Sequence, residues 1–127
     1  MREKALKRNG IFSDGTELSC LIFDFDGTLA ETEEAHRRAF NLAFSKNKLN
    51  WYWDQCIYKK LLQVAGGKER IIFFNESFLS RPNQITSGDV EELYFQKSKL
   101  FLKSVSQGYL QLRPGVKKLL EKAKYNK

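Results

Sequence analysis

The chain has few of the residues that build cross-linked or membrane-inserted proteins. It contains 2 cysteines among 127 residues, and Cys20 and Cys56 form neither a disulfide framework nor a metal-binding spacing. No apolar run approaches the roughly 18 residues that a membrane-spanning helix needs. The N-terminus, MREKALKRNG, is basic and lacks the apolar segment of a secretory signal. We therefore expect no membrane association, and a cytoplasmic location with the plastid stroma as the alternative.

Basic residues outnumber acidic residues, and this balance limits the kinds of molecule that the chain is expected to bind. The chain carries 22 Lys and Arg against 15 Asp and Glu, for a net charge of +7. The basic residues form no block interleaved with aromatics, which argues against nucleic-acid binding. Lysines on solvated helix faces would explain this charge, and a modest positive field would also suit a small anionic substrate. Charge alone does not choose between these two interpretations.

Hydrophobic periodicity predicts one buried strand followed by helices. Residues 18–25, LSCLIFDF, form an apolar run typical of a strand buried on both faces of a parallel sheet. The predicted helices cover residues 33–47, 54–65, 68–79 and 89–107, with a last amphipathic helix after the Pro-Gly turn at 114–115. Thr32 and Asp54 are the expected N-caps of the first two helices, and Gly66 and Gly67 are expected to stop the second.

A single strand cannot form a buried sheet. Its N–H and C=O groups need partner strands, because unpaired buried backbone is costly. No later segment of the chain has the pattern of a second core strand. We therefore expect this chain to be the front part of a larger domain.

Two aspartates close the predicted strand. Asp24 and Asp26 are two residues apart, so their side chains point to the same side, at the sheet edge where ligands bind. Two neighbouring carboxylates suit phosphoryl transfer, in which one attacks phosphorus and the other moves protons. A divalent cation, Mg²⁺, would neutralise the charge. Gly27 lets the backbone turn close to a phosphate and Thr28 helps to set that turn, although the two aspartates could also simply cap a loop.

The segment LIFDFDGTLAET resembles the first motif of the haloacid dehalogenase (HAD) superfamily, an Asp-x-Asp-Gly pattern followed by Thr or Val. Later segments resemble the helical cap, the cap loop and the return to the core of CbbY-like and β-phosphoglucomutase-like members: AETEEAHRRAFNLAF, LLQVAGGKERI and LRPGVKKLLEKAK. The resemblance covers about residues 18–124. It implies an α/β fold with a HAD-like Rossmannoid core, of which only the first strand and the first returning helix are present, and an inserted all-helical cap domain.

The resemblance also implies a division of the chain. Residues 1–17 would be a flexible lead-in, and residues 18–32 would hold the first core strand and the catalytic loop. Residues 33–108 would form the helical cap domain. Residues 109–127 would return to the core and stop before its second strand.

By this resemblance Asp24 is the nucleophile and a Mg²⁺ ligand through its carboxylate. Asp26 is the general acid/base and a second ligand through its backbone carbonyl. The implied substrate-binding residues are Gly27, Thr28, Glu31, His36, Arg37, Gly67, Lys68 and Arg70. Lys68 and Arg70 follow a glycine turn at a helix N-terminus, where basic side chains and backbone amides favour an anion such as a second phosphate.

Several of these residues have plain structural alternatives. Glu31 could be a first-turn charge favoured by the helix dipole, and His36 could be an exposed helical histidine without a role. Arg37 could contact water alone. Gly67 could belong to an ordinary helix C-cap.

The implied activity is Mg²⁺-dependent hydrolysis of a sugar phosphate through an aspartyl-phosphate, typified in the CbbY-like group by xylulose 1,5-bisphosphate. The family's later Ser/Thr, Lys and acidic pair are absent here, so we expect little activity from this chain alone. One alternative is a relative of β-phosphoglucomutase or phosphoglycolate phosphatase. Another is a non-catalytic remnant that serves as a helical binding module. We expect a monomer that binds a small phosphorylated sugar.

Overall fold

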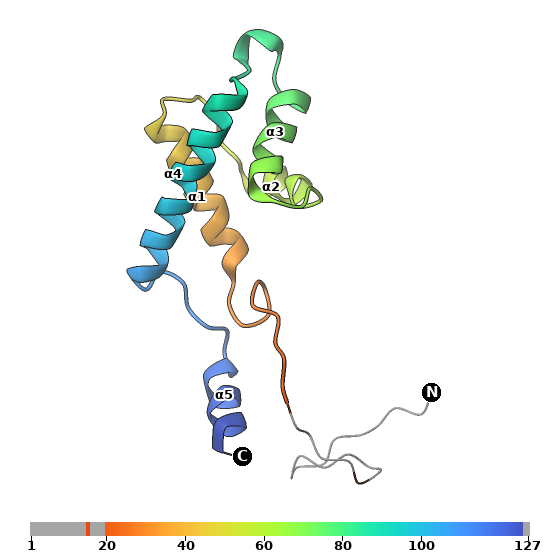
Figure 1. The fold of residues 1–127 in the computed structure, drawn as a ribbon, viewed down its shortest axis with the longest axis vertical. Coiled ribbons are helices and arrows are strands. Elements are labelled where there is room, and N and C mark those ends of the chain that lie inside the picture. The colour runs from red at the N-terminus through yellow and green to blue at the C-terminus, as the bar shows by residue number, and fades with distance from the viewer. Residues whose placement is uncertain (1–14, 16–19, 126–127) are drawn as a thin grey trace.

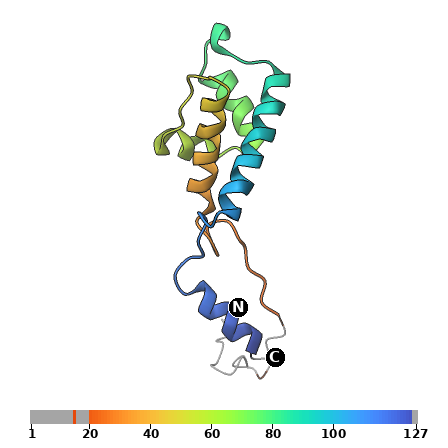
Figure 2. The same cartoon turned by 90° about the vertical axis from the view of Figure 1, so that its left-hand side faces the viewer.

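The computed structural model describes residue 15 and residues 20–125, which are mostly helical (Figure 1). The elements are α1 (Thr32–Lys46), α2 (Gln55–Leu61), α3 (Gly67–Ser77), the 3₁₀ helix η1 (Arg81–Asn83), α4 (Ser87–Ser106) and α5 (Val116–Tyr125). Helices α1 and α4 run antiparallel side by side, and α3 packs on α4 with α2 next to it (Figures 1 and 2). Helix α5 lies apart from this bundle (Figure 2).

Local signals place the helix starts. Asp54 caps α2, as predicted, and its side chain accepts a hydrogen bond from the amide of Ile57 at 2.7 Å. Helix α4 begins at Ser87, earlier than predicted, because Thr86 and Asp89 form a reciprocal capping box. In the described part of the chain, no helix combines the length and apolar character that crossing a membrane requires.

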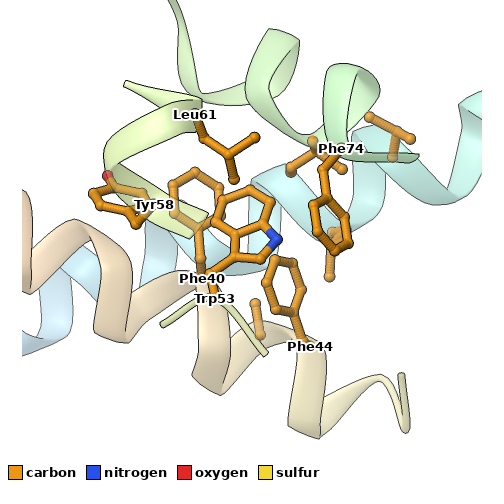
Figure 3. Packing of buried hydrophobic residues seen from close by; sticks show 10 residues of the cluster. Phe40, Phe44, Trp53, Tyr58, Leu61 and Phe74 are labelled. Carbon is orange, nitrogen blue, oxygen red and sulfur yellow. The ribbon is translucent and has the colours of Figure 1, made fainter. Parts of the chain in front are cut away.

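The bundle has its own aromatic core, centred on Trp53 (Figure 3). Trp53 is 0% exposed, and its ring centroid lies 4.7 Å from that of Phe40, 4.8 Å from that of Phe44 and 5.4 Å from that of Phe74. Each such pair contributes about 0.5–1.5 kcal/mol beyond area burial. The helices therefore pack on one another without needing a sheet.

The strand predicted over residues 18–25 is not formed in the described residues. Residues 20–25 adopt neither helix nor strand, and the isolated bridges nearby join Asp26 to Ala30 and Ala30 to Leu112. Ile22 is 92% exposed. A strand depends on a neighbouring strand, and no described segment pairs with residues 20–25 as a strand would; the hydrogen bonds to the carbonyl of Phe25 come from the turn at residues 28–30. Residues 18–19 lie outside the described part of the chain.

Two predicted helix ends are wrong. Thr32 is not the N-cap of α1 but its first residue, while Glu31 takes the cap position without a side-chain cap bond. Gly66 and Gly67 do not stop α2, since Gly66 is the N-cap of α3 and Gly67 its first residue. Gly66 has a φ of +89°, a left-handed conformation that turns the chain into α3 and favours glycine.

Candidate functional site

The predicted catalytic motif forms a tight loop just before α1. Three successive amides, those of residues 28–30, donate to the carbonyl of Phe25 at 3.0–3.3 Å. The amide of Gly27 donates to the carbonyl of Ala30 at 2.8 Å. Gly27 has a φ of +71°, so the turn needs glycine at this position, as the sequence suggested.

The loop exposes two carboxylates, which fit part of a magnesium site. Asp24 and Asp26 are both exposed, and the Thr28 hydroxyl donates to Asp24 Oδ2 at 3.2 Å. Mg²⁺ prefers hard oxygen donors and commonly takes only one or two carboxylates, with water and phosphate completing its shell. The described residues contain no group of three or more His, Cys, Asp or Glu that could hold a metal. The loop therefore offers a partial coordination shell.

A buried lysine meets the histidine of α1. His36 stacks on Phe101 with ring centroids 3.9 Å apart, and its Nδ1 lies 2.9 Å from Nζ of Lys97. Burial lowers the pKa of His36 to about 4, assisted by the charge of Lys97 and opposed by the nearby Asp26 carboxylate. His36 is therefore neutral at pH 7. Because an ammonium only donates, Nδ1 accepts from Lys97 and Nε2 carries the proton.

Lys97 is an unusual residue in this bundle because it is charged and only 5% exposed. Its Nζ lies 4.5 Å from the ring centroid of Phe40 and 5.4 Å from that of Phe101. Burial lowers the pKa of Lys97 to about 8, with a further lowering by the charge of Arg70. The side chain is thus still mainly protonated at pH 7 and supplies a desolvated positive charge.

Lys97 is not among the residues predicted from the sequence, although a signal was present. Position 97 falls within the apolar stripe of α4, three and four residues from Leu93, Tyr94, Leu100 and Phe101. A lysine on a helix face that is otherwise apolar is the feature that would have identified it.

Arg70 joins the same cluster. Its Nε donates to the carbonyl of Val64 at 2.9 Å, and its guanidinium carbon lies 5.9 Å from the ring centroid of Tyr58. Its charge lowers the pKa values of both His36 and Lys97. The structure therefore adds Lys97 in direct contact with the predicted His36, while Arg70 and Asp26 act on His36 through their charges.

The glycine turn before α3 is held against α4. A Cβ on Gly67 would lie 2.7 Å from Cε2 of Tyr94 and 3.4 Å from Cζ of Phe40, so only glycine allows this approach. Lys68 forms an ion pair with Glu91 of α4. Lys68 is therefore engaged on the bundle itself, whereas Arg70, two residues later, is half-buried and donates to the carbonyl of Val64.

Two further predicted residues are engaged in contacts of their own. Arg37 donates to both carboxylate oxygens of Glu34 at 2.8 and 2.7 Å and to the carbonyl of Trp53 at 2.7 Å. It thereby links α1 to the aromatic core. The carboxylate of Glu31 forms an ion pair with Arg113, at 3.0 Å between Oε1 and Nε.

A largely apolar cavity lies beside the Glu31–Arg113 ion pair. It has a volume of about 710 Å³ between α1, α4 and residues 109–114. Its lining includes the apolar Leu42, Leu100 and Leu112 and the predicted substrate residue Glu31, but not Asp24, Asp26 or any residue of the basic cluster. The loop and the basic cluster are therefore the better candidate for binding an anionic substrate.

Comparison with known proteins gives one family. The model of the haloacid dehalogenase-like hydrolase family matches residues 21–127. Protein CbbY of Rhodobacter capsulatus is 43% identical over 108 residues, which cover 85% of this chain and 46% of that protein. A CBBY-like protein of Arabidopsis thaliana is 39% identical over 116 residues, covering 85% of this chain and 36% of that protein. The chain thus spans less than half the length of these curated relatives.

Solved structures of CbbY are also similar to this chain. A crystal structure of CbbY from Rhodobacter sphaeroides in complex with phosphate has a TM-score of 0.69 and 40% sequence identity, covering 81% of this chain and 44% of that one. A mutant of that protein in complex with xylulose-(1,5)bisphosphate has a TM-score of 0.69 and 39% identity, with the same coverage. The resemblance seen in the sequence is thereby confirmed.

Proposed function

The chain belongs to the haloacid dehalogenase-like hydrolase family, and we propose that it forms part of a Mg²⁺-dependent, CbbY-type phosphatase acting on a phosphorylated sugar. One observation carries this proposal: the buried Lys97 contacts His36 on α1, the helix that begins where the loop of Asp24 and Asp26 ends. Carboxylates can act on one phosphate while desolvated cations attract a second. The xylulose-(1,5)bisphosphate bound by a solved relative supports a bisphosphorylated sugar as the substrate.

The two aspartates would divide the chemistry. Asp24 attacks phosphorus, forms an aspartyl-phosphate and displaces the sugar oxygen, while Asp26 gives that oxygen its proton. Asp26 then takes a proton from the water that attacks the aspartyl-phosphate, which releases inorganic phosphate and regenerates Asp24. The Thr28 hydroxyl, 3.2 Å from Asp24 Oδ2, holds the nucleophile in position.

Two oxygens of the loop would hold the metal: the Asp24 carboxylate and the Asp26 backbone carbonyl. When bound, Mg²⁺ neutralises negative charge on the carboxylate and the phosphate. Arg70 and Lys97 attract the anionic substrate, and neutral His36 can donate a hydrogen bond from Nε2.

Four other residues that the sequence predicted as substrate contacts remain part of the proposal: Gly27, Glu31, Gly67 and Lys68. Glu31 and Lys68 each form an ion pair with an exposed side chain, and such pairs are weak enough to exchange for substrate. Gly27 and Gly67 let the backbone come close to a ligand. Arg37 is left out, because its guanidinium is engaged with Glu34 and the Trp53 carbonyl.

We also propose that the division of the chain expected from the sequence holds in the whole enzyme. Residues 33–108 would be the cap, and residues 18–32 and 109–127 would belong to the core. The separate aromatic core of the bundle supports this division.

The test is a chimera that joins this chain to the part of R. capsulatus protein CbbY beyond the matched region. We expect Mg²⁺-dependent phosphate release from xylulose 1,5-bisphosphate, reduced at least about 1,000-fold by Asp24→Asn. Asp54→Asn is the matched control, since asparagine caps a helix as well as aspartate and Asp54 lies at the start of α2. Equal turnover in the Asp24→Asn variant and its parent would overturn the proposal.

A further inference from the structure

The geometry points to Arg113 as a positioning residue that holds the Asp24–Asp26 loop from the segment by which the chain leaves the helical bundle. Arg113 lies outside the Asp-x-Asp-Gly motif, and the sequence predicted no role for it. The inference rests on the proposed function, because it gives Arg113 a part in the same site.

Arg113 contacts the loop in three ways. Its backbone amide donates to the carbonyl of Leu29 at 2.8 Å. Its Nη1 donates to the carbonyl of Gly27, and its Nε pairs with Oε1 of Glu31 at 3.0 Å. One residue therefore binds the start, middle and end of the segment that leads from the aspartates into α1.

These contacts join the two connections of the bundle. Residues 26–31 enter α1, and residues 107–115 leave α4; the two connections meet at one end of the bundle (Figures 1 and 2). Next to Arg113, Leu112 forms an antiparallel bridge with Ala30. The loop conformation is thus tied to a residue 86 positions later in the sequence.

The contact to Gly27 has the clearest consequence for the site. Gly27 lies between Asp26 and Thr28, has a left-handed φ of +71°, and accepts a hydrogen bond from Arg113 at its carbonyl. If this carbonyl turned away, both neighbours would move with it. The hydrogen bond from the Thr28 hydroxyl to Asp24, which holds the proposed nucleophile in position, would then be lost.

A role in stability alone explains the arrangement less well. The Arg113 and Glu31 side chains are 48% and 64% exposed, and exposed ion pairs add little to the stability of a fold. Loop geometry is more sensitive, because a displacement of about 1 Å in a reacting group can lower a rate about 100-fold. The planar guanidinium also serves two acceptors at fixed angles, which a lysine cannot do.

Hydrogen exchange on the 127-residue chain tests the positioning directly. We expect Arg113→Ala to speed amide exchange at residues 27–30 about five-fold or more, because their hydrogen bonds lose support. Arg38→Ala is the matched control: it removes another exposed arginine, paired with Glu34 at 3.0 Å, and should leave the loop unchanged. Unchanged exchange at residues 27–30 in Arg113→Ala would overturn the inference.

The chimera adds a catalytic readout. Arg113→Ala should lower kcat about 10- to 100-fold with KM within about two-fold, because the basic cluster that binds substrate is untouched. Arg113→Lys should recover only part of kcat. A rise in KM alone, or full recovery by lysine, would contradict the positioning role. If the unsubstituted chimera were inactive, the proposed function would fail while hydrogen exchange still decided the inference.

Discussion

Replacing Lys97 by methionine should make the protein more stable at pH 7. Methionine keeps a long flexible side chain against Phe40 and Phe101 but carries no charge. Burial lowers the pKa of Lys97 from the usual 10.5 to about 8, so the folded protein disfavours its charged form. Replacing the charged amine by a neutral side chain therefore removes the free-energy cost of burying that charge.

The magnitude follows from the pKa. At about 1.4 kcal/mol per pKa unit, the lowering corresponds to about 3 kcal/mol before allowing for residual contact with solvent. Loss of the cation–π contacts offsets about 0.5–2 kcal/mol of this. Loss of the hydrogen bond to His36 offsets about 1 kcal/mol more. We expect a net gain in the free energy of unfolding of about 1 kcal/mol.

The advantage of methionine should shrink as the pH rises. Native Lys97 releases its proton near pH 8, whereas the unfolded chain keeps its proton until about pH 10.5. The unfolded state therefore binds more protons between these values, and the stability of the unsubstituted chain rises there relative to the variant. Below pH 8 the difference between the two proteins should be constant.

Urea unfolding followed by tryptophan fluorescence, at pH 7 and pH 10, measures both effects. Lys99→Met is the matched control: this exposed lysine lies two residues further along α4, so its removal should change stability by no more than about 0.5 kcal/mol. A loss of about 1 kcal/mol or more in Lys97→Met at pH 7 would refute the reasoning, as would a difference that does not depend on pH. A confirmed gain would show that the protein keeps this buried charge at the expense of stability.

Two further predictions concern helix starts, and both are measured by the same urea assay. Gly67→Ala should destabilise the fold by about 1–3 kcal/mol, because its Cβ would lie 2.7 Å from Cε2 of Tyr94. Gly88→Ala, whose nearest atom would be 3.8 Å away, should be neutral or stabilise by up to about 1 kcal/mol, and equal effects of the two changes would contradict the packing argument. Asp54→Ala should cost about 1 kcal/mol through the lost cap of α2, and no measurable cost would show that this cap bond is dispensable.

Sequence patterns that span only a few residues were enough to predict much of this structure. The apolar spacing predicted the helices, since a helix face repeats every three to four residues. The Asp54 cap and the turn within the Asp-x-Asp-Gly-Thr loop are local as well, because their hydrogen bonds join residues two to five positions apart; the contacts of Arg113 to the loop are not local. The family followed from the same short motifs, and the comparisons confirmed it.

Other features depend on contacts between residues that are far apart in the sequence, and these could not be predicted from local patterns. Arg37 looked like a phosphate ligand by its position, but folding brings the Trp53 carbonyl and Glu34 to its guanidinium. Lys97 looked like a solvated lysine until α1 and α4 packed around it and set its amine on His36. The strand expected at residues 18–25 depends on partner strands, which no local pattern supplies.

The sequence by itself determined which segments are helical, which residues form the acidic loop, and to which family the chain belongs, because each is encoded over one or two turns of backbone. Only the tertiary structure decided which charges are buried and which side chains meet. The burial of a charge, and hence its pKa, is set by elements that come from distant parts of the chain.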